Sequence, residues 1–142
     1  MSIAIEEARA AGARGEVPVG CVVVRDGTIV ARAGNRTIAD HDPTAHAELI
    51  AIRAAASTLG SERLTDCDLY VTLEPCAMCA AAMSFARIRR LYFGAADAKG
   101  GAVENGVRFF AAPTCHHRPE VYGGINESEC GELLKSFFQA RR

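Results

Sequence analysis

Several features that define common protein classes are missing from this chain of 142 residues. No stretch approaches the roughly 20 apolar residues of a membrane-spanning helix, so no membrane association is expected. The N-terminal residues show no basic segment followed by an apolar run, and we therefore expect no signal peptide and a cytoplasmic protein. The 13 glycines and 5 prolines are scattered without a period, which excludes collagen-like and low-complexity chains.

An excess of positive charge is also missing. The 16 Lys+Arg residues stand against 17 Asp+Glu, giving a formal net charge of −1 at pH 7. Nonspecific binding to nucleic acid requires clustered basic side chains, so a broad basic face is not expected. The basic residues are nevertheless 14 arginines and 2 lysines. Any nucleic acid would have to be bound by a local group of them.

What the chain does have is a composition that suits one folded domain and an unusual number of cysteines. With 49% hydrophobic and 23% charged residues, residues 1–142 are expected to form a single domain. A cytosolic protein keeps its thiols reduced, so the six cysteines indicate metal or redox chemistry more than disulfides. The one Cys-x-x-Cys pair is Cys76 and Cys79. We expect the other four to be reduced core or loop residues: Cys21, Cys67, Cys115 and Cys130.

Hydrophobic spacing predicts alternating strands and helices. Strands over 18–24 and 28–33 should pair as a hairpin through Asp26-Gly27. Thr44 is a suitable N-cap for a helix over 45–59, and Pro75 suits the first turn of a helix ending at residue 86. The remaining expected elements are helices over 2–12, 128–142 and near 109–110, and strands over 68–73, 90–94 and 120–122. The strand–helix–strand order predicts parallel crossovers, and therefore a three-layer α/β/α sandwich around a mixed five-stranded sheet.

Two short motifs carry the candidate chemistry, and each lies at the start of a predicted helix. They are His46-Ala47-Glu48 and Pro75-Cys76-Ala77-Met78-Cys79. Cysteines three apart at a helix start share one face near the positive end of the helix dipole, which favours the metal-binding thiolate. A catalytic zinc site has three protein ligands and one open position for water. Cys76, Cys79 and His46 would supply those three ligands.

Glu48 distinguishes a hydrolytic zinc site from a structural one, because only the former needs a group that takes a proton from water. Residues two apart in a helix point about 200° apart. His46 and Glu48 can therefore converge only if the metal lies beyond the helix end. Taken singly, the histidine could be structural, the cysteines a structural zinc or redox pair, and the glutamate a solvated side chain. The combination favours a catalytic centre.

The two motifs resemble the H-x-E and P-C-x-x-C signature of zinc-dependent nucleoside and nucleobase deaminases. Flanking segments are similar to the bacterial tRNA adenosine deaminases over nearly the whole chain. These segments are 16–20, 34–36, 42–48, 72–79, 86–88, 94–101, 117–118, 129–130 and 137–138. The resemblance implies a cytidine deaminase-like fold, and it implies a homodimer that acts on a tRNA anticodon stem-loop.

The resemblance also assigns roles. His46, Cys76 and Cys79 would hold one Zn²⁺ per chain, and Glu48 would shuttle a proton while zinc-bound hydroxide converts the wobble adenosine to inosine. The implied substrate-binding residues are Asn35 and the Ala47 N–H for the base, Asp97 for a ribose hydroxyl, Lys99 and Arg118 for phosphates, and Phe138 for stacking. Asn35 could instead serve a left-handed turn, and Phe138 a core contact.

Two other functions remain open at this point. A small-molecule deaminase acting on guanine, cytosine or cytidine would have the same zinc core without a basic patch. A zinc-stabilised binding module without catalysis would have the ligands but no use for Glu48.

Overall fold

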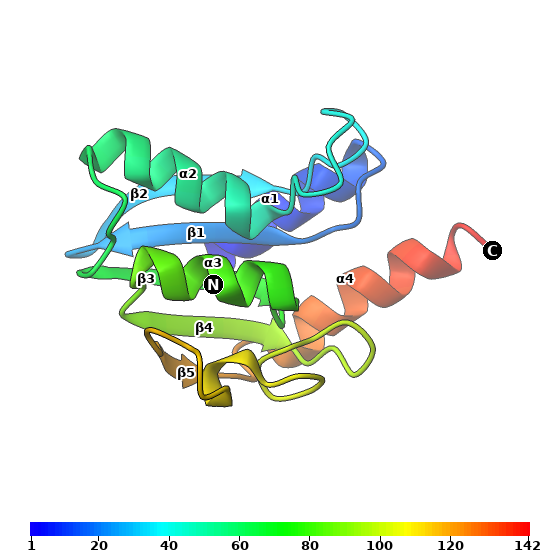
Figure 1. Ribbon diagram of the computed structural model, residues 1–142. Coiled ribbons are helices and arrows are strands. Elements are labelled where there is room, and N and C mark those ends of the chain that lie inside the picture. The colour runs from blue at the N-terminus through cyan, green and yellow to red at the C-terminus, as the bar shows by residue number, and fades with distance from the viewer.

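The computed structural model describes residues 1–142 and has a five-stranded sheet at its centre (Figure 1). The strand order is β2-β1-β3-β4-β5, with β1 antiparallel to both β2 and β3, and β3, β4 and β5 parallel. The elements are α1 (Ser2–Ala13), β1 (Gly20–Arg25), β2 (Thr28–Gly34), α2 (Ala47–Leu59), β3 (Cys67–Leu73), α3 (Ala77–Ala86), β4 (Arg90–Ala95), η1 (Phe109–Ala111), β5 (Glu120–Tyr122) and α4 (Glu127–Gln139).

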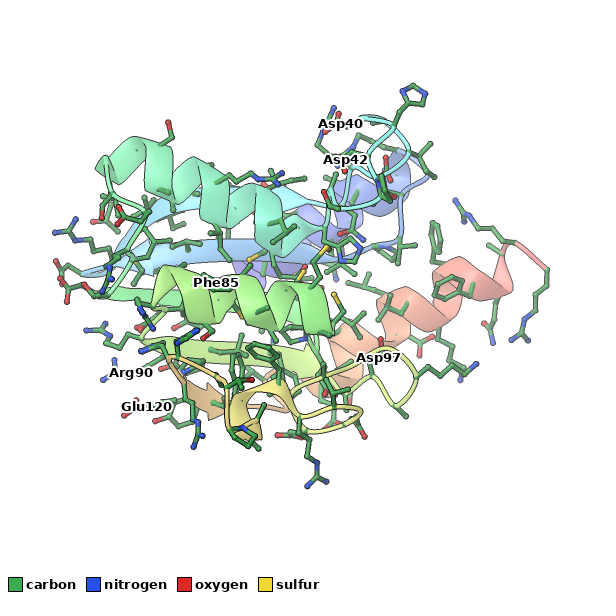
Figure 2. The ribbon with its side chains drawn as sticks, in the orientation of Figure 1. Asp40, Asp42, Phe85, Arg90, Asp97 and Glu120 are labelled. Carbon is green, nitrogen blue, oxygen red and sulfur yellow. The ribbon has the colours of Figure 1, made fainter.

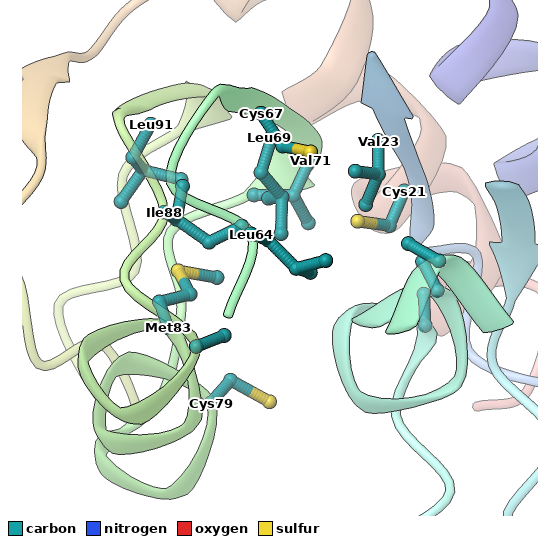
Figure 3. Packing of buried hydrophobic residues seen from close by; sticks show 14 of the residues in the cluster. Cys21, Val23, Leu64, Cys67, Leu69, Val71, Cys79, Met83, Ile88 and Leu91 are labelled. Atoms are coloured by element: carbon teal, nitrogen blue, oxygen red, sulfur yellow. The ribbon is translucent and has the colours of Figure 1, made fainter. Parts of the chain in front are cut away.

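Helices cover both faces of the sheet, which confirms the predicted three-layer sandwich and its mixed sheet. On one face, α2 and α3 bury a core that includes Leu69, Val71 and Met83 (Figure 3). On the other face, α1 and α4 pack where the strands carry glycine. A Cβ at Gly20 would lie 2.5 Å from the Ala8 nitrogen of α1, so only glycine allows this approach. None of the helices is long and apolar enough to cross a membrane.

Both helices that follow the chemical motifs begin later than the sequence predicts. Helix α2 starts at Ala47 with His46 as N-cap, because the Thr44 amide and hydroxyl both bond to the Asp42 carboxylate instead of capping the helix. The prediction that Thr44 is the N-cap is therefore wrong. Helix α3 starts at Ala77, so Pro75 precedes the N-cap and does not lie in the first turn. The C-terminal helix ends at Gln139, three residues before the chain does.

The strand directions place the two motifs together. Strands β3 and β4 are parallel, and α2 and α3 both begin beyond the carboxyl ends of the strands at one edge of the molecule (Figure 1). The two helices also contact each other. Loops at the carboxyl ends of parallel strands are the usual place for a ligand site in an open α/β sheet.

Candidate active site

The three predicted metal ligands meet at the first turns of α2 and α3. His46 Nδ1 lies 3.7 Å from Cys76 Sγ and 3.6 Å from Cys79 Sγ, and the three donor atoms lie within 4.8 Å of one another. A tetrahedral zinc ion bound at about 2.3 Å to sulfur and about 2.0 Å to nitrogen requires an N···S separation of about 3.5 Å. The donor set and its spacing therefore fit zinc.

The N-cap position of His46 explains how it shares a site with Glu48. His46 has extended backbone angles (φ −75°, ψ 149°), so its side chain does not follow the rotation of the helix that starts at Ala47. Glu48 lies inside the first turn and is only 4% exposed. The convergence that regular helix geometry forbids is thus achieved because the histidine lies just outside the helix.

The thiols and the imidazole of this site hold their protons unequally. Hydrogen bonding from Cys79, together with the His46 ring, lowers the pKa of Cys76 to about 4. The same pairing with Cys76, together with burial, raises the pKa of Cys79, and the contact with Cys76 raises the pKa of His46. Without metal, Cys76 is therefore the thiol that ionises first, and Cys79 keeps its proton. Metal binding must displace the Cys79 proton.

Glu48 lies beside this cluster in a setting that disfavours its charge. Burial is the largest cause of its raised pKa, and the charge of Cys76 adds to the effect. The His46 imidazolium and a hydrogen bond with Cys79 oppose the increase. A raised pKa makes a carboxylate a better proton acceptor, and a buried carboxylate that hydrogen-bonds within a cation site is placed to accept and return a proton.

A cavity of about 310 Å³ opens onto this cluster, and two of the predicted substrate-binding residues, Asn35 and Asp97, line it. Its walls include Asn35, His46, Glu48, Cys76 and Asp97. The Ala47 N–H, predicted to contact the base, donates instead to Asn35 Oδ1 over 2.8 Å. Asn35 does not have a left-handed backbone, so the alternative of a turn residue is wrong. Its amide carbonyl holds the start of α2, and its NH₂ group remains available for a ligand.

A second cavity of about 790 Å³ adjoins the first and lies under α4. Val17, Leu73, Asp97 and Gly100 line both cavities. The predicted residues Lys99 and Phe138 line this second cavity together with Arg142. Phe138 is 50% exposed, so it is not the core residue of the alternative interpretation. Asp97, labelled in Figure 2, lies between the two cavities.

Arg118 is the predicted residue that the structure does not bring to either cavity. It lies exposed just before β5, whose first residue pairs with Arg90 at the amino end of β4. That end is opposite to the metal ligands, which follow the carboxyl ends of the strands. Within one copy of the chain, Arg118 is therefore separated from the site.

Sequence reasoning missed several residues of the first cavity, notably Val17, Val19, Leu73 and Glu74. The valines and the leucine are apolar residues typical of strands and their ends, and nothing in the sequence indicates that they line a cavity. Glu74 did carry a signal. It is an acidic residue at the end of an apolar strand and is only 2% exposed.

Comparison with known proteins gives a consistent result. Residues 1–95 match the model of the cytidine and deoxycytidylate deaminase zinc-binding region. The tRNA-specific adenosine deaminase of Agrobacterium fabrum is 63% identical over 142 residues, covering 100% of this chain and 93% of that protein. The one from Haemophilus influenzae is 47% identical over 143 residues, covering 100% and 83%. A solved structure from work on A-to-I editing by tRNA:A34 deaminases at the wobble position of transfer RNA is 65% identical, with a TM-score of 0.93, covering 94% of this chain and 97% of that one.

Proposed function

The chain belongs to the tRNA-specific adenosine deaminases within the zinc-binding cytidine and deoxycytidylate deaminase family, and we propose that it hydrolyses the wobble adenosine of a tRNA anticodon to inosine and ammonia. The observation that carries this function is Glu48, buried beside a complete set of three zinc donors at the floor of a cavity. A zinc site that only stabilised the fold would have no use for that carboxylate.

Each residue of the site has a part in this reaction. When bound by His46, Cys76 and Cys79, zinc supplies a Lewis acid that lowers the pKa of water from about 15.7 toward about 7. Glu48 accepts a proton from the attacking water and delivers it to N1 of adenine. It then takes a second proton from the hydroxyl now attached to C6 and passes it to the amine, which leaves as ammonia while C6 becomes the carbonyl carbon of inosine. Its burial excludes bulk water, so the proton stays on the path between water, Glu48 and the base.

The first cavity is suited to one unstacked base. An anticodon loop releases a base at lower cost than a duplex does, which suits a metal site at the bottom of a cavity. The NH₂ group of Asn35 can donate to a ring nitrogen of that base. If the Ala47 N–H also binds the base, Asn35 Oδ1 must release it, so the two contacts are linked.

The second cavity would hold the neighbouring part of the anticodon loop. The Lys99 ammonium can bind a phosphate, and the Asp97 carboxylate can accept a hydrogen bond from a ribose hydroxyl. The exposed Phe138 ring can stack on a base. Arg118 can contribute to the same RNA only from a second copy of the chain, which accords with the homodimer we propose. Exposed Phe85 on α3, shown in Figure 2, supports such an association. Because tRNA is a cytoplasmic substrate in bacteria, we also propose that the protein acts in the cytoplasm.

The experiment measures inosine in an RNA anticodon stem-loop with adenosine at the wobble position. The DNA copy of the same stem-loop and free guanine, cytosine and cytidine are assayed beside it. We expect inosine in the RNA and no turnover of the free compounds. Deamination of a free base or nucleoside without any inosine in the RNA would instead establish a small-molecule deaminase, which the high identity to tRNA-specific enzymes does not favour.

A further inference from the structure

Glu74 is a buried carboxylate without a basic partner, and it lies one residue before Pro75 and the metal ligand Cys76. Its Oε2 accepts the backbone N–H groups of Val103, Glu104 and Asn105 at 3.1, 2.9 and 3.0 Å. Its Oε1 accepts the Asp97 N–H at 3.0 Å and the Asn105 side-chain amide at 2.7 Å. Five donors compensate one negative charge, so the site is fully satisfied.

These bonds tie both ends of one loop to the metal-binding turn. The loop, residues 97–105, carries Asp97, Lys99 and Gly100, which form the wall between and around the two cavities. Gly101 lies against Glu74, and a Cβ there would be 2.6 Å from Oε2. A further bond joins the Ala102 N–H to the Pro75 carbonyl over 2.9 Å. The loop has no regular secondary structure of its own, so this carboxylate is its main support.

We propose that Glu74 is a positioning residue for substrate binding. It holds the Asp97 backbone at a fixed place relative to the zinc ligands and thereby sets the shape of the wall that contacts the RNA. This inference rests on the proposed function, since it assumes that Asp97 faces the anticodon loop. It does not place Glu74 in contact with the reacting base, and it assigns it no proton transfer.

Glu74→Gln tests this role specifically, because it removes one hydrogen bond, the one from the Asp97 N–H to Oε1. The glutamine carbonyl can take the place of Oε2 and keep the three bonds to residues 103–105. Its NH₂ group then replaces Oε1. The Asn105 amide can turn over to accept from that group, but the backbone N–H of Asp97 cannot. Only the Asp97 end of the loop loses its acceptor, and an unpaired buried donor is costly.

The test compares zinc-loaded parent, Glu74→Gln and the control Glu104→Gln on the RNA stem-loop. Glu104 lies on the same loop with an exposed side chain, so its variant removes the same charge without touching the Glu74 bonds. We expect Glu74→Gln to raise KM about tenfold with kcat within about threefold, and Glu104→Gln to leave both unchanged. Zinc content should remain one per chain in all three proteins.

Amide hydrogen exchange gives a second measurement that does not depend on activity. In Glu74→Gln, the Asp97 amide should lose protection while the amides of residues 103–105 keep theirs. If Glu74→Gln binds and deaminates the RNA as well as Glu104→Gln does, the positioning role is wrong. The role is equally wrong if kcat falls with KM unchanged, or if zinc is lost. If the parent itself makes no inosine in RNA, the proposed function fails instead.

Discussion

Replacing Glu48 by glutamine tests the chemistry most directly, because the side chain keeps its size and hydrogen-bonding reach but loses the ability to carry a proton. Glu48 is 4% exposed and lies beside the thiol of Cys79. General acid–base catalysis contributes about 10²–10⁴-fold to rate. At about 1.36 kcal/mol for each factor of ten, Glu48→Gln should raise the barrier by roughly 3–5 kcal/mol. The assay is inosine formation in the RNA stem-loop under single-turnover conditions, with zinc content measured on the same sample.

The structure also predicts how this substitution affects stability. Burial raises the pKa of Glu48, so the ionised side chain destabilises the folded metal-free protein above that pKa. Below the unfolded-state pKa both states are protonated, and the penalty is absent. Metal-free Glu48→Gln should therefore melt at or above the parent's temperature at pH 7.5 and show no gain at pH 4. The exposed Glu62→Gln is the matched control. Zinc-loaded Glu48→Gln with a rate within threefold of the parent would refute the role of Glu48 as proton carrier.

Three further predictions concern the metal site, a buried carboxylate and the core. In metal-free protein, Cys76 should be alkylated by iodoacetamide with a midpoint near pH 4, because its pKa is about 4, and zinc should block the reaction; a midpoint above pH 8 would contradict the thiolate. Hydrogen bonds from the Ala39 and Ile38 N–H groups outweigh burial and lower the pKa of Glu16. Glu16→Gln should therefore reduce the melting temperature at pH 7. The difference in melting temperature between parent and variant should shrink as pH falls below about 4. Fully buried Met83→Ala should cost about 2–5 kcal/mol in urea unfolding, and a loss below 1 kcal/mol would show that the core around α3 is loosely packed.

Much of the fold was predictable because its elements have strong local signals. The Asp26-Gly27 turn, Gly60 after α2 and the apolar run of β3 each fix an element within one or two residues. The start of α2 differs from its predicted position for a local reason. Thr44 has a better partner in Asp42 than in the helix amides, and this competition depends on a loop conformation that spacing does not reveal.

The metal ligands and Glu48 were predictable, whereas the walls of the cavities were not. His46, Cys76 and Cys79 are residue types that rarely have another reason to occur in this order. The sequence marks Glu74 as an acidic residue at a strand end but does not reveal its partners, because its five donors come from a loop that begins more than twenty residues later in the chain. The resemblance predicts that Arg118 belongs to the site. In the structure it lies at the opposite end of the sheet because β5 pairs in parallel with β4, and the sequence does not reveal this pairing.

The order of these elements along the chain has a consequence for biosynthesis. A single domain folds as a unit, so the zinc donors come together only when the sheet that carries them is complete. All three zinc donors and Glu48 nevertheless lie within the first 79 residues, whereas α4, which covers the second cavity, is the last element of the chain. A frameshift or early stop in the last helix would therefore remove the outer wall of the second cavity while leaving every zinc donor encoded.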